Sequence, residues 1–467
     1  MIKKLIFIIV LIVGTFYLEI VNDNEDGLVS NLNNITNNKL TVEKEVADVN
    51  NLYIYGNHLN MEGNIVLDDS IKEKRVEFAG VILTYPKLEV EDVKLVLYNK
   101  KEEVYDLIYN INEENISFKL SDKINKGLYL DDFKIKDYYA FLYITFKEGI
   151  SKYYALNNTT NYKKTEYYPI LNKYKVSVTS ENDYNTIALK VTKSDSDAIY
   201  DIVIDPGHGG LDVGACYRFT APCETDYTIK YSKALKEKLE GYGLKVALSW
   251  TDVKSSEKVK EYGKSGRTAT SYNLKAKFVF SIHLNSGYDY TLSGLEIYTP
   301  YNIDYTFSKS LAESIKNTAK INYSTNLETK VFDGVYTRTF TKQDIKDYNK
   351  ERVSDGHKPY NNITTKTPYY YMIRETGGFI TGSYVDGDNR DKVENLNRFS
   401  NVGAESYILE LGYIQSKSEI NRFNTNMDKY IEGIANAIIE HLKLNANTNW
   451  CWCLSFNYWN WKDCSTT

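Results

Sequence analysis

Four residues of the chain have the types that metal-assisted hydrolysis needs. His208, Glu224 and His283 are candidate ligands of a zinc ion, and Glu410 is a candidate base. Zinc hydrolases commonly use two histidines and one glutamate and leave one coordination position open for water. A carboxylate that is not a ligand can take a proton and later return it to the leaving group. The set therefore predicts a zinc hydrolase.

The apolar runs before these residues indicate how they could meet. Such runs end just before His208, His283 and Glu410, whereas Glu224 lies on the connection that leaves the first run. In an open parallel sheet, sites form beyond the carboxyl ends of the strands. From about residue 198, apolar runs alternate with helical patterns, which is typical of an α/β fold. We expect strands over residues 200–204, 244–248, 278–282, 295–298, 370–373 and 406–409, and helices over residues 226–240, 265–275, 307–321 and 427–442.

Each candidate residue also has a structural explanation. A histidine at a strand end is more often structural than a ligand, and an acidic residue at a helix start, such as Glu224, favours the helix dipole. Glu410 is harder to explain in this way, because it follows a buried strand. The combination favours a site. The glycines around His208 are expected to let a metal and a bulky substrate approach the backbone closely.

Three stretches carry a resemblance to a known family, over about residues 200–444. They are Ile204-Asp205-Pro206-Gly207-His208-Gly209-Gly210, Ser281-Ile282-His283-Leu284-Asn285 and Leu409-Glu410-Leu411-Gly412-Tyr413-Ile414. In these motifs the chain resembles the zinc-dependent N-acetylmuramoyl-L-alanine amidases of the type-3 catalytic class.

This resemblance implies Zn²⁺ bound by His208, Glu224 and His283, with Glu410 as the general base. It implies cleavage of the amide between the muramic acid lactyl group and L-alanine of the peptidoglycan stem peptide. It also implies a structural role for Arg267, which precedes the second histidine. The expected fold of residues 198–444 is a mostly parallel twisted sheet flanked by helices.

Two long polar stretches depart from the family pattern. One covers residues 322–366, and the other separates Arg374 from Tyr407. Long loops in a compact domain are usually functional or disordered. Because the second stretch precedes the expected Glu410 strand, one hypothesis is that it borders the active cleft and selects the substrate or gates access. A surface elaboration is the alternative.

The chain before the catalytic region predicts three further segments. Residues 1–21 have a basic start and an apolar run, so we expect a membrane anchor, with a cleaved signal peptide as the alternative. Residues 22–50 are predicted to be a flexible spacer. Residues 51–195 alternate apolar and polar residues in short runs, which predicts an all-β, sandwich-like domain. That domain could bind a glycan or serve as a spacer. The protein is thus expected in the cell envelope, anchored with its catalytic domain outside the cytoplasm, or secreted.

The amino-acid composition narrows the classes of partner that the chain is expected to bind. The chain has 467 residues and a formal net charge of −5, so it lacks the basic footprint of a nucleic-acid-binding protein. Peptidoglycan and, through the anchor, a membrane are the expected partners. Of the five cysteines, Cys216 and Cys223 flank a short loop, and the sequence leaves open whether they form a disulfide. Residues 445–467 form a tail rich in Trp and Cys, for which packing against the domain and binding to a polymer are both considered.

Two other functions fit part of the sequence. A non-catalytic wall-binding protein with a degenerate amidase domain is one, and a zinc peptidase that cuts within the stem peptide is the other. Among the remaining histidines, His58 is expected to be a surface or packing residue. His441 is expected to interact with the dipole of the last helix.

Overall fold

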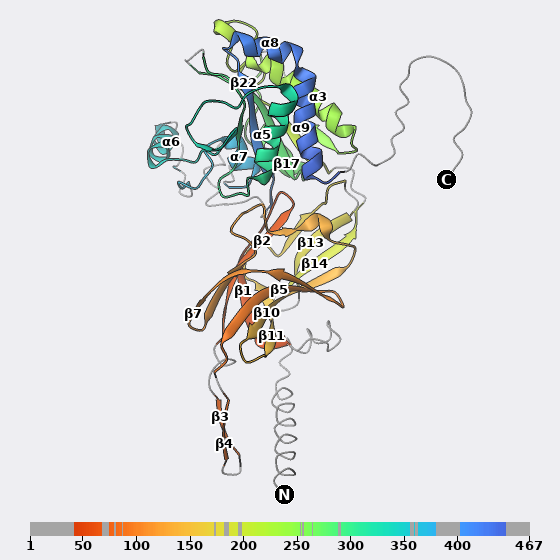
Figure 1. Cartoon of the computed structure of the whole chain (residues 1–467), viewed down its shortest axis with the longest axis vertical. Helices are drawn as coiled ribbons and strands as arrows, with labels where there is room; N and C mark the ends of the chain where they lie inside the picture. Colours follow the sequence, from red (N-terminus) through yellow and green to blue (C-terminus); the bar gives the residue numbers. More distant parts are fainter. Residues whose placement is uncertain are drawn as a thin grey trace, which may run out of the picture.

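The computed structural model describes residues 42–444 except for 68–73, 79–80, 86, 172–173, 182–185, 195–198, 253, 255, 264, 288–290, 355–358, 360–362 and 380–401. Strands dominate the first part of this range, and a sheet with helices on both faces forms the second part (Figure 1). The predicted anchor over residues 1–21 and the tail over residues 445–467 lie outside the described residues. Within the described residues, no helix is long and apolar enough to cross a membrane.

The N-terminal strands are joined in one branched, 13-stranded sheet, with the order β12-β13-β14-β10-β11-β1-β2-β8-β7 along its main path. Twelve of its strands are β1 (Val42–Tyr55), β2 (His58–Val66), β5 (Val90–Tyr98), β6 (Glu102–Asp106), β7 (Ile108–Asn112), β8 (Asn115–Lys119), β9 (Leu128–Tyr129), β10 (Asp137–Phe146), β11 (Ser151–Asn158), β12 (Lys164–Tyr167), β13 (Tyr174–Glu181) and β14 (Thr186–Lys193), and the thirteenth is β21 (Val402–Gly403), near the other end of the chain. A separate two-stranded ribbon contains β3 (Lys74–Phe78) and β4 (Val81–Tyr85).

The strand pairings of this sheet are antiparallel except where β1 pairs with β11 and with β21 (Val402–Gly403). The strand-rich character predicted for residues 51–195 is therefore present. In the described part of the chain, however, these strands belong to one branched sheet and not to two separate ones.

The predicted spacer is wrong for residues 42–50. This segment is the start of β1, and its side chains Val42, Ala47 and Val49 are buried. The polar residues between them masked the apolar pattern in the sequence, because β1 carries a register irregularity that breaks the simple alternation. The rest of the predicted spacer lies outside the described residues.

The second sheet has seven strands in the order β16-β15-β17-β22-β18-β20-β19. They are β15 (Ile202–Pro206), β16 (Val246–Leu248), β17 (Phe278–Asn285), β18 (Glu296–Tyr298), β19 (Lys330–Phe332), β20 (Val335–Tyr336) and β22 (Glu405–Tyr413). The neighbours β16, β15, β17 and β22 pair in parallel, whereas β18 is antiparallel to β22. Since β15, β17 and β22 are adjacent and parallel, their carboxyl ends meet at one edge of the sheet.

Helices cover this sheet because its strands are apolar on both faces. On one face, Ile202 and Ile204 of β15 join a core with α3 (Glu224–Glu240), α5 (Thr306–Ala319), α8 (Lys417–Thr425) and α9 (Met427–His441). On the other face, Val203 packs with residues of α7 (Tyr371–Thr376) and of the segment next to α4 (Thr270–Asn273). Helix α6 (Lys342–Ser354) has no buried residues and lies to the side of the sheet in Figure 1.

Two predicted elements differ from the structure. The strand expected over residues 370–373 is wrong: Tyr371–Thr376 form α7. Its apolar run is too short to distinguish strand from helix by periodicity, and packing of Met372 and Ile373 against the sheet decides for the helix. The helix expected over residues 265–275 is shorter and begins with the 3₁₀ turn Arg267–Ala269.

The N-terminal sheet is bonded directly to the strand region that leads into β22. Ile54 and Tyr55 of β1 pair with β21, and the Gly56 N–H donates to the Gly403 carbonyl at 2.8 Å. Asn125 also donates to a carboxylate oxygen of Glu405, the first residue of β22, at 3.0 Å. Burial raises the pKa of that carboxyl to about 7.

The boundary expected near residue 195 stays a prediction. The hypothesised gating insert extends from Arg374 to Tyr407, and residues 380–401 of it lie outside the described residues.

Two histidines lie close together where these halves meet. His441, at the end of α9, stacks on Phe307 with ring centroids 4.0 Å apart, and His58 begins β2. Burial, followed by the charges of Lys126 and Lys443, lowers the pKa of His441 to about 4. Burial, followed by the electrostatic effects of His441 and Lys126, lowers the pKa of His58 to about 3. His441 is therefore neutral at pH 7, and the expectation of a favourable charge–dipole interaction is wrong.

These histidines predict a loss of stability in acid. Their pKa is lower in the folded chain than the ordinary 6.5, so the unfolded chain binds protons first as the pH falls from 6.5 towards about 4. His441→Phe keeps an aromatic ring against Phe307 but removes one such group. We expect the melting temperature of this variant to fall less between pH 7 and pH 5 than that of the wild type. If calorimetry shows that the melting temperatures of the variant and the wild type fall equally between pH 7 and pH 5, this explanation is contradicted.

Candidate metal centre

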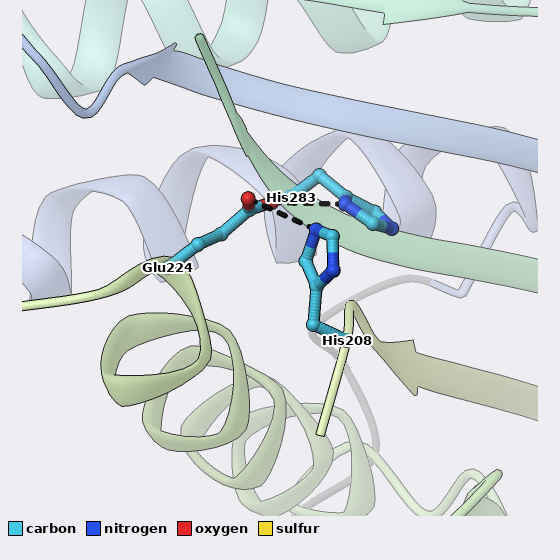
Figure 2. A group of neighbouring side chains, drawn as sticks. All are labelled: His208, Glu224 and His283. Atoms are coloured by element: carbon cyan, nitrogen blue, oxygen red, sulfur yellow. Dashed lines mark hydrogen bonds and ion pairs between the residues drawn. The ribbon is translucent and has the colours of Figure 1, made fainter. Parts of the chain in front are cut away.

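The structure brings all three predicted ligands together. One ligand atom each of His208, Glu224 and His283 lies within 4.8 Å of the other two. Nε2 of His208 is 2.9 Å from Oε2 of Glu224, and Nδ1 of His283 is 2.9 Å from Oε1 of the same carboxylate. Figure 2 shows both imidazole rings turned towards this carboxylate from separate segments. Among the described residues this is the one such group.

Each ligand is placed by the end of a regular element. His208 follows β15 on a tight loop and has a left-handed backbone (φ 62°), which is uncommon for a residue with a side chain. Glu224 is the first residue of α3 and is only 3% exposed. His283 lies near the carboxyl end of β17. The convergence at the carboxyl edge of the sheet is the one that the strand pattern predicted.

The Glu224 carboxylate is held on both oxygens. Oε1 accepts a hydrogen bond from the Leu284 N–H at 2.9 Å, and Oε2 accepts one from the Ala215 N–H at 3.3 Å. Burial by itself would raise the pKa of Glu224, but the bonds and charges of His208 and His283 outweigh it and leave this pKa lowered. The carboxylate is therefore ionised, as a metal ligand must be.

Asp212 supports His208 from the other side of the ring. Its Oδ2 lies 2.9 Å from Nδ1 of His208, and its Oδ1 accepts the Gly214 N–H at 3.1 Å. Burial lowers the pKa of His208, but Glu224 and Asp212 more than compensate and raise it to about 9. A carboxylate behind a ligating histidine fixes the orientation of its ring. The sequence analysis assigned no role to Asp212, although an aspartate four residues after a loop histidine was a usable signal.

Arg267 fastens the loop that carries His208. Its Nε donates to Asp205 at 2.8 Å, and its terminal nitrogens donate to the carbonyls of Pro206 and His208. Ser281 donates to the second oxygen of Asp205 at 2.6 Å. Both members of this ion pair are buried, so the charges depend on each other and not on solvent. The structural role implied for Arg267 agrees with these contacts.

Glu410 lies beside the cluster without a partner for one oxygen. In the pairing of β17 with β22 it is opposite His283, and across the antiparallel pair with β18 it is opposite Glu296. Its Oε2 is buried and has no hydrogen-bond partner among the described residues. Burial, followed by the charges of Glu224 and Glu296, raises the pKa of Glu410 well above the ordinary value.

Glu296 is a second residue that the sequence analysis did not single out. It is fully buried, and the hydroxyls of Tyr298 and Tyr413 donate to its two carboxylate oxygens at 2.8 Å and 2.5 Å. Its sequence context, an acidic residue inside a short apolar strand, is the same anomaly that drew attention to Glu410. Its charge is one reason why Glu410 favours a proton.

The glycines near His208 make room for the ligands themselves. A Cβ at Gly207 would lie 2.6 Å from Cε1 of His283, and a Cβ at Gly214 would lie 2.7 Å from Oε2 of Glu224. The sequence-based expectation was room for a metal and substrate. The observed close approaches are instead to ligand side chains, so a larger residue here would displace the site.

The donor set fits a zinc ion. Two imidazole nitrogens and one carboxylate oxygen form the three-ligand arrangement of hydrolytic zinc sites. The three donor atoms lie within 4.8 Å of one another, and Oε2 of Glu410 lacks a partner among the described residues. The arrangement can therefore hold a divalent metal and place a carboxyl group next to it.

Comparisons with known proteins point to one family. A family model described as N-acetylmuramoyl-L-alanine amidase matches residues 202–440. The catalytic domain of the N-acetylmuramoyl-L-alanine amidase CwlV from Bacillus (Paenibacillus) polymyxa var. colistinus is 19% identical, with a TM-score of 0.34, over 53% of this chain and 100% of its own. An N-acetylmuramoyl-L-alanine amidase of Nostoc punctiforme is 21% identical, with a TM-score of 0.32, over 53% and 99%. The CwlD amidase from Clostridioides difficile, solved in complex with the GerS lipoprotein, is 19% identical, with a TM-score of 0.32, over 53% and 100%. Among curated proteins, no match was found.

The contact between Asp212 and His208 predicts a defect in metal affinity. We expect Asp212→Asn to weaken Zn²⁺ binding by about 10–100-fold, because the ring loses the charged group that orients it. Competition with a chromophoric chelator measures this change. Asp252→Asn is the matched control, since its side chain is 90% exposed and lies in a surface ion pair. Equal affinities of the two variants would remove Asp212 from the site.

Proposed function

The chain belongs to the family of N-acetylmuramoyl-L-alanine amidases, and we propose that it hydrolyses, with Zn²⁺, the amide bond between N-acetylmuramic acid and L-alanine in peptidoglycan. The observation that carries the zinc assignment is the convergence of His208, Glu224 and His283 within 4.8 Å. Glu410, opposite His283 on the neighbouring strand, is the proposed general base.

When bound, Zn²⁺ supplies a Lewis acid that polarises the amide carbonyl and lowers the pKa of a water molecule. The chain's own contribution to proton transfer is Glu410, whose carboxyl would be ionised because the positive charge of a bound metal lowers the pKa of a neighbouring carboxyl group. We assign its Oε2 as the atom that accepts a proton from the attacking water and then delivers it to the departing amine nitrogen of L-alanine. The products are a free lactyl carboxylate and a free L-alanine amino terminus, so atoms and charges balance.

Other residues keep the ligands in place during this reaction. The N–H groups of Ala215 and Leu284 fix the carboxylate of Glu224. Asp212 fixes the ring of His208. Arg267 donates hydrogen bonds to the carbonyls of Pro206 and His208, which lie on either side of Gly207. Because these contacts are made by the chain's own groups, they limit the reorganisation that the reaction requires.

The same proposal places the enzyme in the cell envelope, with the catalytic region outside the cytoplasm or secreted. Its substrate is a wall polymer, and the Cys216–Cys223 disulfide is typical of proteins outside the cytoplasm. The basic start and apolar run over residues 1–21 support export, by an anchor or a signal peptide. Separating membrane and culture-medium fractions would distinguish these two modes.

Removing the metal should abolish activity. We expect protein treated with EDTA and verified as metal-free to release no peptide from purified peptidoglycan, and stoichiometric Zn²⁺ to restore release. Mass spectrometry of the products identifies the bond, because an amidase frees L-alanine amino termini. Cleavage within the stem peptide would instead indicate a peptidase, and activity of verified metal-free protein would overturn the zinc assignment.

Replacing the base should separate metal binding from hydrolysis. We expect Glu410→Gln to retain Zn²⁺ while kcat falls by about 10²–10⁴-fold, the usual contribution of a general base. Metal content and turnover are measured on the same sample. Glu237→Gln is the control, because Glu237 is exposed on α3. Unchanged turnover in Glu410→Gln would remove this residue from the mechanism.

A further inference from the structure

The connection between His208 and Glu224 carries a disulfide that the mechanism above does not use. Cys216 and Cys223 are bonded, and the residue after Cys223 is Glu224, the first residue of α3. We propose that this disulfide is a positioning element of the metal centre, so that Zn²⁺ binds tightly in the disulfide form and weakly in the dithiol form. The inference rests on the proposed function, since it assigns Zn²⁺ to the same ligands.

The residues just before Cys216 touch both neighbouring ligands. The Ala215 N–H donates to Oε2 of Glu224 at 3.3 Å, and the Ala215 carbonyl accepts the Glu224 N–H at 2.8 Å. A Cβ at Gly214 would lie 2.6 Å from Cδ2 of His208, so this backbone is pressed against the imidazole. The Gly214 N–H also donates to Asp212, the partner of His208. Residues 214–216, hereafter the ligand-contact segment, thus determine how both ligands are oriented.

The core holds the ligand-contact segment only through partly buried side chains. None of residues 211–223 is buried, although Glu224 is 3% exposed. At the far end of the disulfide loop, Phe219 is 92% exposed, and both Arg218 and Phe219 have left-handed backbones. Within the loop, Ala215 and Tyr217 pack against the core, and both are only partly buried. A loop with so few buried apolar contacts opens readily.

The disulfide adds a covalent restraint to these weak contacts. Cys216 and Cys223 face each other as an isolated antiparallel bridge, and the Tyr217 N–H donates to the Pro222 carbonyl at 3.0 Å. Cys223 is tied to α3, since its N–H donates to Oδ2 of Asp226 at 2.9 Å. The covalent bond therefore transfers the rigidity of the helix start to the ligand-contact segment. Without it, the Ala215 N–H would leave the Glu224 carboxylate more often, and the ligand would lose a contact of the kind that affects metal affinity about 10–100-fold.

The test compares two proteins in a background in which the tail residues Cys451, Cys453 and Cys464 are replaced by serine. One keeps the disulfide, and the other carries Cys216→Ser and Cys223→Ser. We expect the Zn²⁺ dissociation constant, measured by chelator competition well below the melting temperature, to be about 10–100-fold higher in the serine pair. Hydrogen exchange at Ala215 and Glu224 should be faster in the same variant, and a merely global loss of stability would not be confined to these amides.

Reduction provides a second measurement if the serine pair fails to fold. A phosphine reductant gives two electrons to the disulfide and, with two protons from water, yields two thiols and the phosphine oxide. Localised faster exchange after reduction, reversed by reoxidation, supports the proposal. Unchanged exchange at Ala215 and Glu224, or an unchanged Zn²⁺ dissociation constant in a folded serine pair, overturns it. Failure of the disulfide form itself to bind Zn²⁺ would instead overturn the proposed function, so the two failures are distinguishable.

Discussion

The candidate metal centre depends on one buried charge, the carboxylate of Glu224. Solvent does not reach it, so the protein must provide every group that stabilises it. Two histidines and two backbone N–H groups do so, and they come from the loop after β15, from β17 and from the segment before α3. Satisfying this single carboxylate therefore fixes the connection between β15 and α3 relative to β17. The donor set for a metal is a consequence of that requirement.

A second carboxylate at the same edge has the opposite surroundings. Glu410 has no partner for Oε2 and lies near the charges of Glu224 and Glu296, so it favours a proton where Glu224 favours ionisation. Neighbouring groups whose environments drive their pKa values apart are typical of acid–base sites. The sheet register produces this contrast, because it places Glu410 opposite His283 on one side and Glu296 on the other.

The sequence was informative where a local pattern determined the outcome. Apolar runs that end in a polar residue placed His208, His283 and Glu410 at one sheet edge, and the adjacent parallel strands confirm that placement. Asp212 was missed because its role depends on how a glycine-rich loop folds back, which carries no periodic signal. The prediction of a strand over residues 370–373 was wrong because the apolar run is short and fits either a strand or a helix. Tertiary packing determines that it is a helix. The pairing of β1 with β21 joins residues too far apart in sequence for any local pattern to reveal.

That last pairing also constrains the order in which the molecule can be completed during synthesis. β1 emerges from the ribosome early, whereas β21 emerges only after most of the chain. Until then, the hydrogen-bonding groups of β1 around Ile54 remain an open edge, and open edges are templates for pairing with other chains. Contacts between such distant residues form slowly. The N-terminal sheet therefore cannot close this edge before the segment that leads into the Glu410 strand has been synthesised.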